Sequence, residues 1–298
     1  MMSSKDTKKI ILGTAQLDQI YGINSKERIG NSEAKKILKF SKESGIDYID
    51  TAPVYGNSEK IIGSSELQDL KIISKLPVIP RNTKSVKKWV LNQVLESLSN
   101  LNKSSLDTLL LHDPKILLKK EGKIIYEAME SLKKENKVKK IGISIYAPNI
   151  LNQIIKKFDF EVVQAPLNIF DQRILERKYL DLLCENNIQL HARSIFLQGL
   201  ILREQNFEKK YFSRWKESFL ATKSLASKHK LSILELCLSF IISKKEVDKF
   251  LIGVDSLSEL KMIISFLKKG HEIKEDMKHL SCSEENLINP TKWPKNNK

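Results

Sequence analysis

Four side chains suited to proton transfer stand at the ends of short β-prone runs in the first part of the chain. Asp50 ends one such run, and Tyr55 lies on the Pro- and Gly-containing turn that follows it. Lys75 ends the next run, and His112 comes directly after a third. Each residue alone is typical of turn or surface chemistry. Their ordered placement at strand ends favours a common functional site.

These residue types form a set that could reduce a carbonyl group. Reduction by hydride needs a proton donor at the oxygen, where negative charge develops. Tyr55 has a reference pKa of about 10, and an ammonium at about 4 Å would favour its phenolate by up to roughly 4 kcal/mol before desolvation, at an effective dielectric near 20. We expect Asp50 to keep Lys75 charged, Lys75 to acidify Tyr55, and His112 to orient the substrate oxygen.

The elements that carry these residues alternate between strand and helix along the chain. We predict strands over 9–16, 46–50, 70–75, 106–111, 140–144, 161–166, 189–194 and 249–253. Helical patterns separate them, and the longest connection, 195–230, is expected to hold one helix bearing Trp215 and Phe219. Such alternation is typical of a (β/α)8 TIM barrel, whose active site lies at the carboxyl ends of the strands.

Length and composition agree with one barrel domain over residues 1–298, in which 270–298 is a C-terminal tail packed on the barrel. The net charge of +15 comes mostly from scattered lysines, without an arginine cluster interleaved with aromatics, so we expect solvated helix faces and no nucleic acid partner. No apolar run is long enough for a bilayer and no apolar signal core is seen, which favours a soluble, cytoplasmic protein without a membrane partner.

The cysteines favour a reducing compartment. Cys184, Cys237 and Cys282 are odd in number, far apart and not in metal-ligand spacing, so we expect no metal site. Cys184 and Cys237 lie in apolar helical patterns and are expected to be small core residues.

The order of Asp50, Tyr55, Lys75 and His112 resembles the active-site tetrad of the aldo/keto reductase family, which is carried on a (β/α)8 barrel. The resemblance extends over nearly the whole chain through the segments 13–16, 50–56, 142–144, 163–164 and 194–200. It implies an NAD(P)H-dependent oxidoreductase that reduces the carbonyl of an aldehyde or ketone, with Tyr55 as general acid.

The resemblance also implies a nicotinamide nucleotide site. Ser144 and Gln164 would hold the nicotinamide amide, and Asp50 would also touch the ribose. Gly13 and Thr14 would let a ligand approach the backbone closely. The pyrophosphate would be lined by Ser194, Phe196 and Gly199, and the adenosine end by Gly253, Asp255 and Lys261.

Two departures from the family pattern affect the expected cofactor. Ile145 stands where family members often have Asn, which removes one carboxamide contact. The adenosine end offers Asp255 and Glu259 but only Lys261 as a cation, and Ile263 stands where Asn is expected. NADPH is the family's usual partner and is favoured, while NADH is the alternative.

A finer resemblance is to a bacterial subgroup associated with surface-polysaccharide sugar biosynthesis. Few residues precede the first predicted strand, so the N-terminal hairpin of other members would be missing. The segments 13–16, 21–23, 166–173 and 191–194 also look like this subgroup. A sugar or nucleotide-sugar carbonyl would be the substrate.

Two other functions fit a barrel with these residues. Lys75 could form a Schiff base in a lyase. Alternatively, the chain could be a non-catalytic module that binds a nicotinamide nucleotide and docks on a partner. Neither G-x-G-x-x-G after the first strand nor G-x-x-x-x-G-K-[ST] is present, so a doubly wound dinucleotide domain and a P-loop are not supported. A monomer or a weak homo-oligomer is expected.

Overall fold

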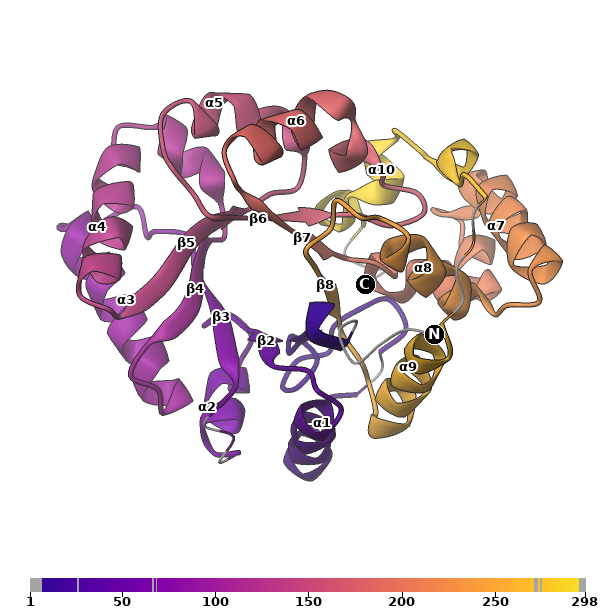
Figure 1. The fold of residues 1–298 in the computed structure, drawn as a ribbon, viewed down its shortest axis with the longest axis horizontal. Coiled ribbons are helices and arrows are strands. Elements are labelled where there is room, and N and C mark those ends of the chain that lie inside the picture. Colours follow the sequence, from indigo (N-terminus) through magenta and orange to yellow (C-terminus); the bar gives the residue numbers. More distant parts are fainter. Residues whose placement is uncertain are drawn as a thin grey trace.

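The computed structural model describes residues 7–294 except 26, 66, 68, 271, 272 and 274. Its strands close into a parallel barrel in chain order, β1 to β8, and β1 pairs with β8 (Figure 1). The strands are β1 (Ile10–Gly13), β2 (Tyr48–Asp50), β3 (Lys71–Leu76), β4 (Leu106–Leu111), β5 (Val138–Ser144), β6 (Val162–Pro166), β7 (Gln189–Arg193) and β8 (Lys249–Ile252). The (β/α)8 barrel predicted from the sequence is confirmed.

Strand alternation divides the interior into two regions. Side chains that face the lumen include a small apolar group, formed by Ile11, Ile73, Leu110 and Val162. The residues between them in sequence, such as Leu12 and Ile72, pack outward against the helices in the much larger core. Lumen positions therefore stack in layers from the amino end to the carboxyl end of the barrel.

Helices cover the outside of the barrel (Figure 1). They are α1 (Asn31–Glu43), α2 (Ser58–Gly63), α3 (Val86–Leu101), α4 (Gly122–Lys134), α5 (Leu151–Ile155), α6 (Arg177–Glu185), α7 (Lys216–Lys228), α8 (Ile233–Ile242), α9 (Leu257–Lys269) and α10 (Glu285–Ile288). Local sequence sets several of their starts. Ser232 and Glu235 form a capping box on α8, and Ser256 caps α9.

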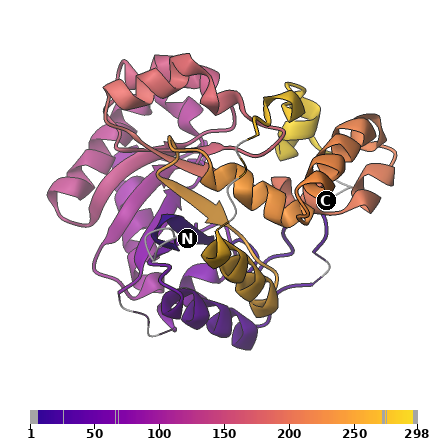
Figure 2. The same cartoon turned by 45° about the vertical axis from the view of Figure 1, so that its right-hand side comes forward.

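The long connection after β7 and the C-terminal segment pack against each other, since the Tyr211 hydroxyl donates to the Asn286 carbonyl of α10 at 3.1 Å; in Figure 2 the yellow C-terminal segment lies next to the orange helices of the connection. The connection passes through the short 3-10 helices η5 (Leu197–Leu202), η6 (Glu204–Glu208) and η7 (Ser213–Trp215) before α7. The Phe212 ring meets Trp293 edge-on, with centroids 5.1 Å apart. The large apolar residues of the C-terminal segment are buried, namely Met277, Leu280, Leu287, Ile288 and Trp293. This packing holds the C-terminal segment against the barrel.

The cysteine expectation was half right. Cys237 is buried in α8, but Cys184 is exposed on α6 because it lies on the helix face opposite the one that buries Tyr179 and Leu183. None of the described helices combines the length and apolarity that a bilayer crossing requires.

Candidate active site

The four tetrad residues meet at the carboxyl mouth of the barrel. The Lys75 ammonium, from β3, forms an ion pair with Asp50 of β2 and donates to the Thr51 carbonyl at 3.1 Å and the Tyr55 hydroxyl at 3.4 Å. Asp50 and Lys75 side chains are only 3% and 2% exposed. The second Asp50 oxygen accepts from Gln164 Nε2 at 2.8 Å. The buried pair is therefore fully hydrogen-bonded, as a buried charge requires.

His112 completes the tetrad next to Tyr55. The two rings meet edge to face, with centroids 6.5 Å apart and planes at 89°. Burial, followed by the positive charges of Lys75 and Arg193, lowers the pKa of His112 to about 4. Its imidazole is therefore neutral near pH 7 and can donate one hydrogen bond.

The electrostatics of Tyr55 differ from the sequence expectation. Burial and then the negative charge of Asp50 raise the pKa of Tyr55 above its ordinary value, and the charge of Arg193 lowers it only in part. The expected acidification is therefore outweighed by desolvation. As a result the phenol stays protonated near neutral pH, which is the form that a proton donor needs.

The tetrad opens into a cavity of about 380 Å³. Most of the expected cofactor residues line this cavity, namely Gly13, Thr14, Ser144, Gln164, Ser194, Phe196, Gly199, Gly253 and Asp255. Lys261 does not, because its ammonium lies 5.6 Å from the centre of the Phe40 ring on α1. Glu259 lines the cavity in its place, and its carboxylate accepts from the Asp255 amide at 2.8 Å. Arg203 also lines the cavity, and its positive charge acts on Glu259, so this end carries charges of both signs.

The residues at the inner wall match the hydrogen-bonding groups of a carboxamide. Ser144 Oγ donates to Gln164 Oε1 at 3.2 Å. The hydroxyl and the amide thus form with each other the kind of hydrogen bond that either could form with a carboxamide. At the outer end, a Cβ built on Gly253 would fall 2.2 Å from the side-chain amide of Gln16, so the two residues lie in close contact at the cavity wall. The polar groups of Ser144 and Gln164 are therefore of the kind that can bind a carboxamide.

The wall after β7 has an unusual backbone. Ser194, Leu197, Gln198 and Gly199 all have positive φ, between 47° and 81°. Hydrogen bonds to the first loop hold this conformation, since Ile23 N donates to Gln198 O at 3.0 Å and Asn24 Nδ2 donates to Gly199 O at 2.8 Å. Strained backbone of this kind persists where surrounding structure over-determines it, and it clusters at functional sites.

Arg193 is a site residue that the sequence interpretation missed. It ends β7, lines the cavity, and lies 4.5 Å from the centre of the Tyr146 ring. Its guanidinium donates to the Ile145 carbonyl at 2.9 Å and to Ser194 Oγ at 3.0 Å, whereas its Nε is buried and has no hydrogen-bond partner among the described residues. The sequence offered one signal for this position: Arg193 lies two residues after His191 on β7, so both side chains face the barrel lumen.

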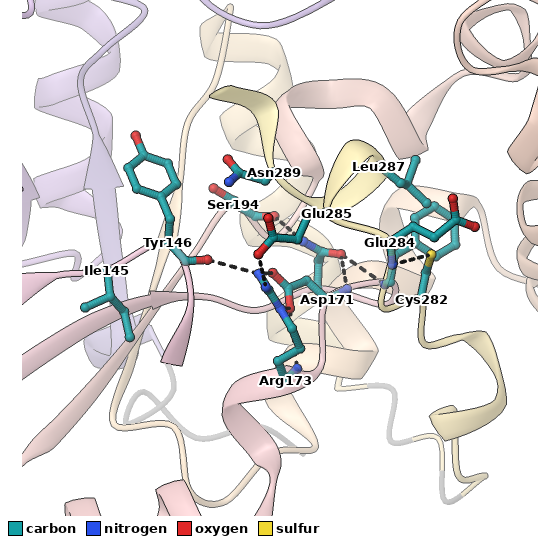
Figure 3. Close-up of polar contacts among 12 residues, drawn as sticks. Ile145, Tyr146, Asp171, Arg173, Ser194, Cys282, Glu284, Glu285, Leu287 and Asn289 are labelled. Carbon is teal, nitrogen blue, oxygen red and sulfur yellow. Dashed lines mark hydrogen bonds and ion pairs between the residues drawn. The ribbon is translucent and has the colours of Figure 1, made fainter. Parts of the chain in front are cut away.

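The C-terminal segment also reaches the cavity, where Pro290 and Thr291 form part of the lining. Figure 3 shows how Arg173 holds this segment. Its guanidinium donates to the Tyr146 carbonyl at 3.0 Å, chelates the Asp171 carboxylate at 2.8 Å, and pairs with Glu285 of α10 at 3.5 Å. No local sequence pattern predicts the ion pair between Arg173 and Glu285, because these two residues are far apart in the chain.

The family model for the aldo/keto reductase family matches residues 9–281. An uncharacterized oxidoreductase from Bacillus subtilis, YqkF, is 26% identical over 84% of this chain and 87% of its own, and a glyoxal reductase from the same organism is 28% identical over 67% and 71%. Among solved structures, the aldo-keto reductase AKR11C1 from Bacillus halodurans matches with a TM-score of 0.75, 19% identity, and coverage of 96% of this chain and 95% of that chain. The chain therefore belongs to the aldo/keto reductase family and is an NAD(P)H-dependent oxidoreductase.

Proposed function

We propose that the protein reduces an aldehyde or ketone by hydride transfer from NAD(P)H, with Tyr55 as the general acid. The observation that carries this proposal is a protonated phenol 3.4 Å from the Lys75 ammonium, in a cavity that also holds the neutral His112. When bound, the reduced nicotinamide supplies the hydride. The protein must then bind the carbonyl, exclude water and deliver a proton.

Each tetrad residue takes a defined part in that task. Tyr55 Oη gives its proton to the carbonyl oxygen as negative charge develops there. The Lys75 ammonium stabilises the resulting phenolate, and Asp50 holds that ammonium in place. The neutral imidazole of His112 donates a hydrogen bond to the same oxygen and so fixes the carbonyl before transfer.

The nucleotide would be held along the cavity. Ser144 and Gln164 would bind the carboxamide, and the wall from Ser194 through Phe196 to Gly199 would carry the pyrophosphate. At the adenosine end, Asp255 and Glu259 would face a 2′-phosphate, while Lys261 points elsewhere. Arg203 lines the same cavity and acts on Glu259, so a cation is also present there; NADPH stays the favoured nucleotide by resemblance to the family, and NADH is the alternative.

A sugar or nucleotide sugar is our proposed substrate, as in enzymes of surface-polysaccharide biosynthesis. An Arabidopsis thaliana relative named L-galactose dehydrogenase, 23% identical over 95% of this chain, supports a polyhydroxylated substrate. Tyr21, Tyr146 and Arg193 offer polar and aromatic groups at the cavity wall, which suit such molecules.

We further propose one domain over residues 1–298 that acts in the cytoplasm as a monomer or weak homo-oligomer. Light scattering would test the oligomeric state.

The contacts of Lys75 argue against a Schiff-base lyase. Its ammonium donates three hydrogen bonds, to Asp50, Thr51 and Tyr55. An ammonium nitrogen has no lone pair with which to attack a carbonyl. A nucleophilic lysine needs the neutral amine. Borohydride treatment with a carbonyl substrate tests this point, because a covalent adduct on Lys75 would support the lyase and oppose hydride transfer.

The decisive experiment has two stages. Fluorescence titration with NADH and NADPH first measures nucleotide affinity, and an aldose, ketose and nucleotide-sugar panel then measures oxidation of the tighter nucleotide. We expect Tyr55→Phe to keep nucleotide affinity but to lower kcat by about 10²- to 10⁴-fold, the usual contribution of a general acid. Tyr126→Phe is the matched control, because the Tyr126 hydroxyl bonds only the Asp159 carbonyl, at 3.2 Å on the outside of the barrel. Nucleotide binding without turnover on any carbonyl would instead favour the non-catalytic module.

A further inference from the structure

The amino end of the barrel, opposite the active site, presents an unusual set of lumen residues. Alternation along the strands places Lys71, Lys140 and Lys249 in the lumen, since each lies two residues before a residue of the next lumen layer. Register aligns Tyr48 with Lys71, and His191 with Lys249. Three cations from three strands thus converge on one mouth of the barrel.

Contacts across the lumen bring these cations together. The ammonium groups of Lys249 and Lys71 lie 4.1 Å and 5.1 Å from the centre of the same Tyr48 ring. Lys140 on β5 donates to Gln189 Oε1 on β7 at 3.1 Å, across the intervening strand. Burial and the charges of Lys71 and Lys140 lower the pKa of Lys249, which reflects their mutual repulsion. Lys71 is exposed at this mouth, whereas the Lys249 ammonium also donates to the Lys8 carbonyl of the 3-10 helix η1 (Thr7–Lys9) at 3.1 Å.

Within the described part of the chain, none of these three lysines forms an ion pair. The nearest carboxylates that act on Lys249 are Asp107 and Asp248, and both are engaged elsewhere. Asp107 accepts from Thr108 Oγ1 at 3.0 Å, and Asp248 accepts from the Leu190 amide at 2.8 Å. The negative charges of Asp107 and Asp248 act on Lys249 and offset part of the positive charge, which leaves an excess of one cation among these five side chains.

A buried histidine adds an independent observation. His191 faces the lumen one layer above Gln189 and is 1% exposed, and neither of its ring nitrogens has a hydrogen-bond partner in the part of the chain that the structure describes. The charges of Lys249 and Lys140 both act on its ring, so it lies close to these two lysines. A buried polar side chain without partners is unusual and calls for an explanation. A ligand or ordered water at the mouth would provide its partner.

We propose that the amino-terminal mouth of the barrel binds a phosphate-type oxyanion between Lys71, Lys140 and Lys249, with His191 beneath it. Ammonium groups are good phosphate binders, and the Tyr48 hydroxyl and Gln189 amide add neutral donors at the rim. The site is separate from the carboxyl-end cavity, and no residue is shared between the two. The phosphate could be inorganic or part of a phosphorylated metabolite.

The test is a titration of the full-length, isotope-labelled protein with inorganic phosphate, in which NMR monitors the ring signals of His191 and the amide signals of Lys249. Chloride at matched ionic strength is run in parallel. We expect saturable shifts with phosphate and none with chloride. AMP and glucose 6-phosphate, titrated in the same way, distinguish a free oxyanion from a phosphorylated metabolite.

Variants locate the site. Lys140→Met and Lys249→Met should each weaken phosphate binding at least about tenfold, since each removes one of three charges around the anion. Lys139→Met is the matched control, because Lys139 is exposed and is the neighbour of Lys140 on the opposite face of β5, and it should change affinity less than twofold. Equal losses in all three variants would mean an adventitious ion attracted by net charge and would overturn the proposal. Absence of phosphate-specific shifts in the wild-type protein would overturn it without any variant.

Discussion

The Lys75→Met substitution tests whether the ammonium stabilises the phenolate of Tyr55 during proton transfer. At 3.4 Å and an effective dielectric near 20, the attraction between the ammonium and a phenolate is at most about 5 kcal/mol, and the Asp50 charge offsets part of it. We therefore expect kcat to fall by about 10²- to 10⁴-fold, or roughly 3 to 5 kcal/mol. Steady-state oxidation of the reduced nucleotide measures this loss.

The same substitution should also reduce stability. It leaves the Asp50 carboxylate buried with only the Gln164 amide as a side-chain partner, at 2.8 Å. Breaking a buried ion pair in this way typically costs about 3 to 5 kcal/mol, which urea unfolding can measure. The double variant Asp50→Asn/Lys75→Met removes both charges and should recover most of the lost free energy of unfolding.

Activity and stability should therefore separate. The double variant should stay as inactive as Lys75→Met, because the group that stabilises the phenolate is still missing. Recovery of activity together with stability would mean that Lys75 acts only by maintaining the fold, and the catalytic reasoning would be wrong. Activity within tenfold of wild type in Lys75→Met would refute it directly.

Three further predictions concern other parts of the structure. Burial and nearby lysines lower the pKa of His191 to about 3, so below pH 6.5 the unfolded chain binds a proton that the native state does not. The free energy of unfolding should therefore fall by about 1.4 kcal/mol per pH unit as the pH drops toward 3. Urea unfolding of His191→Leu should show a weaker dependence of this free energy on pH. Glu259→Gln should improve NADPH affinity relative to NADH about fivefold, for removal of roughly 1 kcal/mol of repulsion, and an unchanged ratio in fluorescence titrations would contradict the placement of Glu259 at the adenosine end. Arg173→Met should free the segment around Glu285, raise KM severalfold with a smaller change in kcat, and increase proteolysis near the C-terminus; unaltered KM and proteolysis would show that packing alone holds the segment.

Much of the barrel and its tetrad could be predicted from local patterns. Short β-prone runs with polar residues at their carboxyl ends place Asp50, Lys75 and His112 at one mouth once the strands are parallel and in chain order. Helix starts at Ser232 and Ser256 follow from side-chain capping, which depends on residues three positions apart. These features are local, and local chemistry is visible in a sequence.

Other features depend on neighbours that are distant in the chain. The pKa of Tyr55 could not be read from its nearby cation, because burial and Asp50 shift it the other way. The sequence placed Lys261 at the adenosine end, whereas the fold turns it onto Phe40 and leaves Glu259 there. Cys184 was expected in the core, but the orientation of α6 exposes it.

The sequence by itself thus determined the barrel and the candidate residues for proton transfer, because alternation, capping and strand-end chemistry act over a few residues. Only the tertiary structure decided which charges meet. Closure of the barrel brought Arg193 into the cavity, gathered Lys71, Lys140 and Lys249 at the opposite mouth, and seated the C-terminal segment on Arg173. Burial and Coulomb interactions depend on distances in space, which a linear chain does not contain.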